Sequence, residues 1–343
     1  MNYDKQQSGV GMAVFASHSA LQLVLGGMAQ GVRTALFGHG RHLRLYRRFP
    51  GIRCDFVEYS GPETLDRLAD EGFVLVPNGS VVEYVRPENL FKTRIRVFGS
   101  RELLRVEADQ HQKMELLKKA GIPIPKTFAG PSEVDRPVIV KLPGARGGMD
   151  YRVTEDPQEV RDLQLRAVSK GIVNDPSELM IQEYLIGATM YAHYFHSPIY
   201  GRTEITGFDI RYESDVDGLR RAPVRIAEKL SPTFTVVGNI PVFPRERLLE
   251  TFLDYGERFV ETVRRELGGK FAGPFCLECV VDSGLNVIAF EFSGRIVAGT
   301  NVYSVHGSPY LALYFGRPMT VGERVAHELK TAAETGSLEE VLT

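Results

Sequence analysis

The sequence predicts an α/β fold whose C-terminal part is of the α+β type. Three stretches of the 343-residue chain support this prediction. Residues 11–38 alternate an apolar strand, an apolar-faced helix and a second strand. Residues 137–156 carry a glycine-rich loop between two strands. Residues 273–301 contain two apolar strands, and each has one acidic residue at a position where an apolar residue is expected. We therefore expect an open sheet near the N-terminus and hairpin structure further along the chain.

The first stretch, GMAVFASHSALQLVLGGMAQGVRTALFG, reads as a Rossmann-like βαβ unit whose helix ends at Gly31. Its turn Ser17-His18-Ser19 lies where a strand end meets a helix N-terminus, a position at which open α/β sheets bind anions. Either serine is more simply explained as a helix cap, so His18 is the distinctive residue. The turn lacks the G-x-G-x-x-G fingerprint of dinucleotide binding.

A second polar turn, PNGS at 77–80, follows the apolar residues 73–76. An ordinary turn serine is the alternative interpretation of Ser80. Two polar turns at strand ends of one sheet suggest that His18 and Ser80 face a shared crevice. Further along, TFTVVGNIPVFP places Asn239 at another strand end.

Residues 103–128 read as one helix that is stopped by Gly121 and the prolines that follow it. This helix marks the first domain boundary. The tail at 321–336 is expected to form a final surface helix. The predicted domains are 1–105, 106–190 and 191–343.

The strand that contains Lys141 runs into a glycine-rich loop, which returns into a second strand. A Walker loop would open a helix instead, so this loop is not of that type. A glycine hairpin can lay backbone N–H groups over phosphates as a flap, with Lys141 supplying positive charge. An ordinary loop is an equal alternative. The flap residues are Gly144, Arg146, Gly147 and Gly148.

Residues 178–195 contain two apolar runs, and the polar pair Gln182-Glu183 interrupts the first. A nucleotide base held between domains needs backbone donors at such a place and a carboxylate for the ribose hydroxyls, a role that Glu183 fits. The charge-dense residues 206–223 lack the spacing of a calcium loop.

Residues 273–301 read as a hairpin with its turn at Asp282-Ser283-Gly284. The midpoint of Glu278 and Glu291 falls inside that turn, so a symmetric hairpin sets the two carboxylates opposite each other, roughly 5 Å apart at Cβ. Two like charges so placed need a cation, and hard oxygen ligands suit Mg²⁺ completed by nucleotide phosphates. Alternatively, one glutamate faces solvent or pairs with Arg295. Because their repulsion would be relieved, we expect Glu291→Gln to leave the metal-free protein no less stable.

Composition excludes several classes of function. The chain is 43% hydrophobic and 24% charged, with a formal charge of −2 and interspersed signs, so it predicts neither nucleic-acid nor membrane-surface binding. No apolar run spans a bilayer, and three cysteines build no disulfide framework, which favours a cytoplasmic location.

The order of these features resembles the ATP-grasp superfamily of carboxylate-amine ligases: a helix with Lys113 before AGIPIP, a strand lysine, a glycine flap, an acidic hinge and paired acids. Further segments narrow the resemblance to the archaeal formate-dependent 5-formaminoimidazole-4-carboxamide ribonucleotide (FAICAR) synthetases of purine biosynthesis. The resemblance covers nearly the whole chain. The segments that carry it are ASHSALQ, VPNGS, VKLPGARGG, RYESDVDGL, GNIPV, GPFCLE and FEFSGRI.

The resemblance implies roles for named residues. His18, Ser80 and Asn239 would contact the acceptor 5-aminoimidazole-4-carboxamide ribonucleotide (AICAR), and Arg295 would be a phosphate contact. Glu278 and Glu291 would bind the metal. The residues implied in ATP binding are Lys113, Lys141, Gly144, Arg146, Gly147, Gly148, Gln182, Glu183, Tyr184 and Glu213.

It also implies a reaction. Formate attacks the γ-phosphate of ATP to give formyl phosphate, and the 5-amino group of AICAR then displaces phosphate. Mg²⁺, with Mn²⁺ as the alternative, would be the metal, ATP the cosubstrate, and folate would not be needed. The resemblance implies a homo-oligomer, a trimer or a hexamer.

Two departures from the family pattern leave the substrate open. Asn78 stands where the family usually has histidine, and Met149-Asp150 replace Arg-Gly after GARGG. One alternative is therefore a paralogous ligase that joins another small carboxylate to another amine. A second, of a different class, is a nucleotide-binding regulatory subunit without turnover. Phosphate release that depends on formate and the ribonucleotide separates them.

Overall fold

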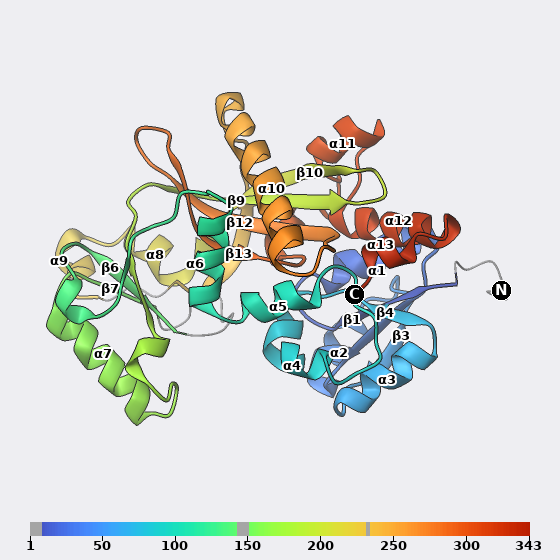
Figure 1. Cartoon of the computed structure of the whole chain (residues 1–343), viewed down its shortest axis with the longest axis horizontal. Coiled ribbons are helices and arrows are strands. Elements are labelled where there is room, and N and C mark those ends of the chain that lie inside the picture. Colours follow the sequence, from blue (N-terminus) through green and yellow to red (C-terminus); the bar gives the residue numbers. More distant parts are fainter. Residues whose placement is uncertain (1–8, 143–150, 231–233) are drawn as a thin grey trace.

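The computed structural model describes residues 9–142, 151–230 and 234–343, and within these ranges the strands form three sheets (Figure 1). The first sheet is parallel, in the order β3-β2-β1-β4, which confirms the open α/β sheet expected from the βαβ opening. Its elements are β1 (Gly11–Phe15), α1 (Ala20–Gln30), β2 (Thr34–Gly38), α2 (Gly40–Tyr46), β3 (Asp55–Glu58), α3 (Pro62–Asp70), β4 (Phe73–Leu75) and α4 (Pro87–Leu90).

Two short helices connect this sheet to the rest of the molecule, α5 (Arg101–Glu107) and α6 (Gln110–Lys119). The prediction of a single helix here was wrong. The carboxylate of Asp109 accepts hydrogen bonds from the backbone N–H groups of His111 and Gln112, at 2.9 and 3.0 Å. Asp109 therefore caps a new helix, because its side chain satisfies N–H groups that lack partners in the first turn.

The second sheet is small and antiparallel, in the order β5-β8-β6-β7. It packs on α7 through a core of its own, which includes Val138, Val160 and Ile181. Its elements are β5 (Thr127–Phe128), β6 (Val138–Lys141), β7 (Arg152–Thr154), α7 (Pro157–Ser169) and β8 (Met180–Glu183).

The third sheet is antiparallel, with five strands in the order β11-β10-β9-β12-β13. Its outermost strand on one side, β11, is followed directly by the long helix α10, which crosses the strands of the sheet (Figure 1). The elements are β9 (Ala188–Ser197), β10 (Arg202–Glu213), α8 (Ser214–Leu219), α9 (Val224–Ala227), β11 (Val236–Pro241), α10 (Glu246–Glu266), β12 (Gly273–Val281) and β13 (Val287–Ser293).

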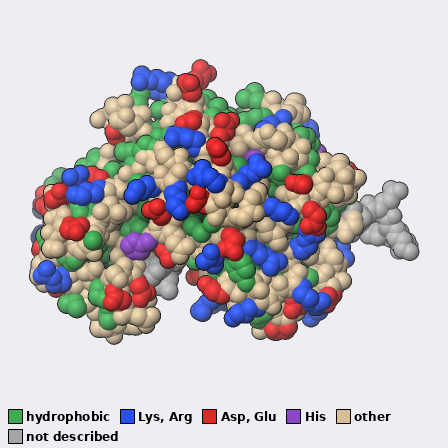
Figure 2. All heavy atoms as spheres, in the orientation of Figure 1, with side chains coloured by type: hydrophobic (Ala, Val, Ile, Leu, Met, Phe, Trp, Pro, Cys, Tyr) green, Lys and Arg blue, Asp and Glu red, His purple; other side chains and the backbone are tan. Residues whose placement is uncertain are grey.

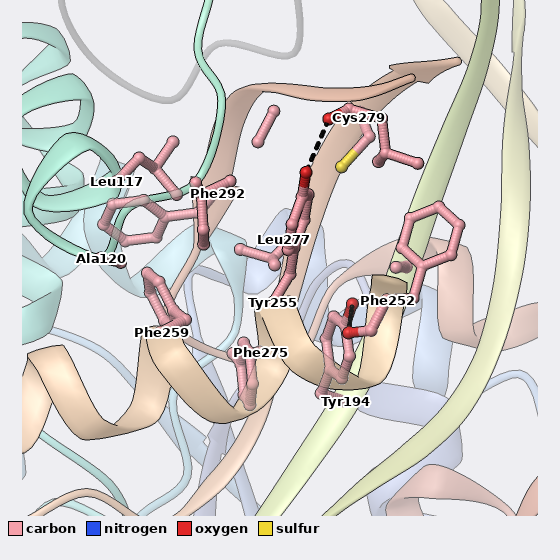
Figure 3. Packing of buried hydrophobic residues seen from close by; sticks show 14 of the residues in the cluster. Leu117, Ala120, Tyr194, Phe252, Tyr255, Phe259, Phe275, Leu277, Cys279 and Phe292 are labelled. Atoms are coloured by element: carbon pink, nitrogen blue, oxygen red, sulfur yellow. Dashed lines mark hydrogen bonds between the residues drawn. The ribbon is translucent and has the colours of Figure 1, made fainter. Parts of the chain in front are cut away.

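Helix α10 covers one face of the five-stranded sheet. Phe252, Tyr255 and Phe259 recur at helical spacing and point toward aromatic and aliphatic side chains of the strands (Figure 3). Phe259 stacks on Phe275 with ring centroids 5.1 Å apart. Because successive strand residues point to opposite faces, this apolar packing leaves the other face of the sheet for polar side chains.

The last two helices, α12 (Val321–Glu334) and α13 (Leu338–Val341), return to the first sheet (Figure 1). Helix α12 crosses α1 so closely that a Cβ on Gly26 or Gly322 would collide with the other helix's backbone. The helix is present as expected, but the prediction that it lies on the surface was wrong. Helix α12 buries Val325 and Leu329 in the core of the first sheet. Helix α11 (Pro309–Phe315) precedes them in the chain.

No helix in the described parts of the chain is long and apolar enough to cross a bilayer. The face seen in Figure 2 mixes basic and acidic side chains, in keeping with the formal charge of −2.

Candidate active site

The predicted carboxylate pair is formed as expected. Glu278 on β12 and Glu291 on β13 are paired residues in the antiparallel ladder, and a bulge follows Glu278. Both project from the face of the sheet opposite α10, because Leu277 and Phe292 beside them belong to the α10 core. The predicted pairing of Glu278 with Glu291 is therefore confirmed, although the bulge shifts the pairs nearer the turn by one residue, so that Cys279 lies opposite Ala289.

The cations that neutralise this pair come from other elements. Arg211 on β10 lies 2.7 Å from Glu278, between guanidinium nitrogen and carboxylate oxygen. Lys113 of α6 lies 2.6 Å from Glu291, and the ammonium of Lys141 lies 3.8 Å from the same carboxylate. Arg295 does not take part: it pairs with Glu107 of α5 at 2.7 Å. The alternative that matched a glutamate with Arg295 was wrong.

These lysines change the expectation for Glu291. Burial raises the pKa of its carboxyl group, but the charges of Lys113 and Lys141 outweigh burial and lower the pKa to about 2. Glu291 is therefore held ionised by attraction, and the repulsion between the two glutamates is not the dominant effect. We therefore revise the sequence-based expectation and predict that Glu291→Gln destabilises the metal-free protein, because the substitution leaves two buried ammonium groups without their carboxylate.

A cavity of about 320 Å³ lies between the small sheet and the polar face of the five-stranded sheet. Of the residues that the sequence assigned to ATP and metal, Lys141, Gln182, Glu183, Tyr184, Glu213, Glu278 and Glu291 line it. Lys113 lies behind Glu291, with its side chain 1% exposed, and does not line the cavity. The segment that begins at Gln182 and the segment 210–217 thus meet at one cavity with the carboxylate pair.

Lys141 ends β6 and points toward the carboxylates. Its ammonium group donates to the backbone carbonyl of Phe290 at 3.1 Å. Burial lowers the pKa of Lys141, while the nearby carboxylate of Glu291 raises it. The glycine-loop residues Gly144, Arg146, Gly147 and Gly148 lie outside the described residues, but Lys141 and Tyr151, on either side of them, both line the cavity.

The two acids at the opposite end of the cavity differ in their partners. Glu183 accepts from the backbone N–H of Lys126 at 3.1 Å and from Arg136 at 3.0 Å. Both of its carboxylate oxygens are thus engaged by protein. Burial raises the pKa of Glu213 to about 7, with a smaller contribution from the charge of Asp217. The geometry favours Glu213 over Glu183 as the carboxylate for nucleotide hydroxyls.

The two N-terminal candidates sit on adjoining turns. A Cβ on Gly79 would lie 3.3 Å from the imidazole of His18 and 3.4 Å from the guanidinium of Arg295, so all three converge. His18 adopts a left-handed conformation with φ 51°. Although its side chain is solvent-exposed, the dense surroundings and the charges of Arg295 and Arg211 lower the pKa of His18 to about 4.

Asn78 explains how these turns are joined. Its amide donates to the backbone carbonyls of Phe15 and Ser17 at 2.9 and 3.0 Å, and its Oδ1 accepts from the backbone N–H of Ser80. This residue, a departure from the family pattern, is fully buried and has a structural role here. Ser80 is buried, and its hydroxyl has no hydrogen-bond partner within the described protein. An unsatisfied buried hydroxyl is a suitable contact for a ligand.

Asn239 lies across the ladder from Arg211, on the edge strand β11. Arg211 is close enough to His18 to lower the pKa of the imidazole. Arg211 is thus paired with Asn239 in the sheet and acts electrostatically on His18. The sequence gave no role in the site to Arg211, which stacks 4.0 Å over the ring of Tyr191, or to Asp209. The alternation Phe208-Asp209-Ile210-Arg211 is the period of a strand with one polar face and could have identified both.

The chain is similar to known proteins over nearly its whole length. Family models match residues 12–128, described as a protein of unknown function (DUF1246), and residues 159–343, described as a domain of unknown function (DUF1297). A FAICAR synthetase from Ignicoccus hospitalis is 48% identical over 339 residues, which cover 96% of this chain and 95% of that protein. The chain belongs to the FAICAR synthetase family. A second family member, from Pyrobaculum aerophilum, is 45% identical over 100% of this chain and 96% of its own length.

Solved structures agree with this membership. An IMP biosynthesis protein PurP from Thermococcus kodakaraensis matches with a TM-score of 0.78 and 29% identity, over 97% of this chain and 100% of that one. Biotin carboxylase from Campylobacter jejuni, crystallised with an ATP analogue, matches with a TM-score of 0.64 and 13% identity over 93% of this chain and 71% of that one. The second likeness shows the fold alone, and the fold is ATP-grasp.

Proposed function

We propose that this member of the FAICAR synthetase family uses ATP to join formate to the 5-amino group of AICAR, with FAICAR, ADP and phosphate as products. The observation that carries the proposal is the carboxylate pair, Glu278 and Glu291, with buried lysines beside it at the base of a cavity between two sheets. Carbon–nitrogen ligation needs a place where a phosphoryl group is transferred away from water, and this arrangement fits that need.

ATP is assigned to the cavity. Gln182 on β8 and Tyr184, which follows that strand, line the cavity where the base would be held, and Glu213 would contact the ribose hydroxyls. Lys141 would meet the phosphates, since an ammonium group compensates charge that spreads over phosphate oxygens in the transition state. Lys113, which does not line the cavity, would act through its ion pair with Glu291. The flap residues 144–148 are assigned to cover them.

The donor set suits Mg²⁺. Two carboxylates face each other across the hairpin, and among the described residues no group of three or more His, Cys, Asp or Glu side chains could hold a metal. Mg²⁺ is commonly held by one or two carboxylates and completed by substrate phosphates. When bound by Glu278 and Glu291, the ion would supply positive charge to the phosphates, and Mn²⁺ is the alternative with the same donors.

The reaction has two steps. A formate oxygen attacks the γ-phosphorus, the bond to the β-phosphate oxygen breaks, and ADP leaves. The 5-amino nitrogen then attacks the formyl carbon, the C–O bond to phosphate breaks, and the amine loses a proton. Arg211 lines the cavity assigned to ATP, pairs with Glu278 and lowers the pKa of His18 through its charge. Its guanidinium would stabilise the negative charge on the transferred phosphoryl group.

AICAR is assigned to His18, Ser80 and Asn239, with Arg295 as a phosphate contact. Support comes from the convergence of His18 and Arg295 on Gly79, from the unsatisfied hydroxyl of Ser80, and from the place of Asn239 opposite Arg211. No step needs a folate.

The test is phosphate release from ATP. We expect release only when formate and AICAR are both present, and we expect FAICAR to be detected by mass spectrometry. Acetate in place of formate, and omission of AICAR, are the controls. Release with a different carboxylate and amine would assign the chain to another ligation, and no release with any pair would favour a binding subunit. Light scattering would measure the assembly, which the family resemblance implies is a trimer or hexamer.

A further inference from the structure

The side-chain amide of Asn239 is oriented by a neighbouring carboxylate. Its Nδ2 donates to Oδ2 of Asp209 on β10 at 2.7 Å. An ionised carboxylate only accepts hydrogen bonds, so the NH₂ group of Asn239 must face Asp209. The amide oxygen of Asn239 is therefore the atom that remains for a ligand.

Asp209 is held on its other side by His193. The two side chains are each 1% exposed, and Nε2 of His193 lies 2.6 Å from Oδ1 of Asp209. Gly299 packs against both residues, and a Cβ on it would collide with Oδ1 of Asp209. Burial raises the pKa of Asp209, but the hydrogen bond and charge of His193, with the charge of Arg211, outweigh it and lower the pKa. Asp209 is thus an ionised, immobile acceptor at neutral pH.

We propose that Asp209 is a positioning residue that turns the oxygen of the Asn239 amide toward the acceptor, where it accepts a hydrogen bond from an N–H group. The proposal rests on the proposed function, in which Asn239 contacts AICAR. An amide oxygen favours amine or carboxamide N–H groups over a carbonyl or carboxylate at the same place, since two acceptors cannot pair. The pair Asp209–Asn239 would therefore select an amine-bearing ligand.

The substitution Asp209→Asn tests the orientation. Because Asp209 only accepts, Nε2 of His193 must be a donor, and it would hold the oxygen of the amide introduced at position 209. The NH₂ group of that amide would then face Asn239, whose own amide must flip to accept from it. With the NH₂ of Asn239 now toward the N–H of AICAR, we expect the KM for AICAR to rise about tenfold or more and the KM for ATP to change less than about twofold.

The double variant Asp209→Asn/Asn239→Asp restores the geometry with reversed polarity. The amide at position 209 would donate to the carboxylate at position 239, and the other oxygen of that carboxylate would face AICAR, again as an acceptor. We expect the double variant to recover most of the affinity for AICAR that Asp209→Asn loses. Such a rescue would not follow if Asp209 only supported the packing of the sheet.

Asn239→Asp alone gives an independent measurement that does not require Asp209→Asn to fold. Two adjacent carboxylates would share a proton at lower pH, which restores one hydrogen bond between them. The KM for AICAR of this variant should therefore fall as the pH is lowered from 8 to 6, whereas the parent should change little. A flat profile in the variant would contradict the proposal.

Thr206→Val is the matched control. Thr206 is buried in the same strand and its hydroxyl has no hydrogen-bond partner within the described protein, so this isosteric change should leave both KM values near those of the parent. An Asp209→Asn enzyme with normal KM for AICAR, or a double variant no better than the singles, would overturn the positioning role. If Asn239→Ala left the KM for AICAR unchanged in an active enzyme, the assignment of Asn239 to the acceptor would fail instead.

Discussion

Glu291 has a structural environment that affects stability, and in the proposed function it also binds the metal. The carboxylate lies 2.6 Å from Lys113 and faces Glu278 across the hairpin. The pKa of its carboxyl group is lowered to about 2, so the ionised carboxylate is more favourable in the folded protein than in the unfolded chain. The stability that this provides is present above the ordinary pKa of about 4.3 and is lost as the pH falls toward 2.

We expect Glu291→Gln to reduce turnover by at least about a hundredfold, because a strong electrostatic contact in the transition state is lost. We also expect it to destabilise the metal-free protein, on the order of 3 kcal/mol at pH 7. Urea unfolding at pH 7 and pH 3 measures this, and the difference between parent and variant should shrink at pH 3. Glu266→Gln, in a largely exposed pair with Lys119, is the control and should have a far smaller effect. Equal free energies of unfolding for the parent and Glu291→Gln would show that the buried charges of the lysines are stabilised without Glu291.

Glu213 predicts a pH dependence of nucleotide binding. Burial raises its pKa to about 7, so the ionised form is gained as the pH rises through 7. If the carboxylate accepts from ribose hydroxyls, the KM for ATP should fall between pH 6 and pH 8. Glu213→Gln should remove this slope, whereas Glu183→Gln should keep it, because Glu183 is paired with Arg136. The same slope in parent and Glu213→Gln would assign the titration to another group.

Substitution of His18 should affect the binding of AICAR and ATP differently. It adjoins Gly79 and Arg295 and does not line the nucleotide cavity. His18→Ala should therefore raise the KM for AICAR about tenfold or more and leave the KM for ATP nearly unchanged. Steady-state kinetics with each substrate varied in turn measures both. Loss of ATP affinity with normal AICAR affinity would reverse the assignment of ligands to sites.

At the scale of elements, the crossing of α1 and α12 depends on glycine. A Cβ on Gly322 would overlap the backbone carbonyl of Gln22, so the helices must separate to accept alanine. We expect Gly322→Ala to destabilise the protein by about 1–3 kcal/mol or more, as overpacking does. Gly218→Ala in α8 is the control, since no atom lies near its Cβ position and alanine favours a helix. Thermal unfolding compares the two variants. Equal Tm values would contradict the claim that α1 and α12 pack too closely to accept a side chain at position 322.

At the scale of the molecule, the end of the chain completes the first sheet. Backbone hydrogen bonds of 2.9 Å join Val97 and Thr343 in both directions, and Leu342 is buried in the core of that sheet. Removal of residues 337–343 should therefore destabilise the N-terminal sheet, although the deletion lies at the other end of the sequence. Hydrogen exchange should show lost protection at β1 and β4 before the five-stranded sheet is affected. Unchanged protection at β1 would mean that the tail only covers a stable sheet.

Features set by local chemistry were predictable from the sequence. Strand alternation and the turn residues predicted the hairpin, and the βαβ pattern predicted the parallel sheet. The pairing of Glu278 with Glu291 also depends on a bulge between Glu278 and Cys279, which the sequence did not indicate. The break before Asp109 was missed because a helix pattern continues across it, and the competing signal is a single capping carboxylate. Asp109 shows that local periodicity alone does not fix helix boundaries.

The sequence by itself determined the βαβ opening, the hairpin and seven of the residues that line the cavity, because each depends on spacing within a short segment. The tertiary structure alone decided which charges meet. Lys113 reaches Glu291 across 178 residues, Arg211 reaches Glu278 across 67, and Asn239 is oriented by Asp209 across 30. Ion pairing and amide orientation depend on burial and on distances between separate elements, which no pattern in one segment encodes.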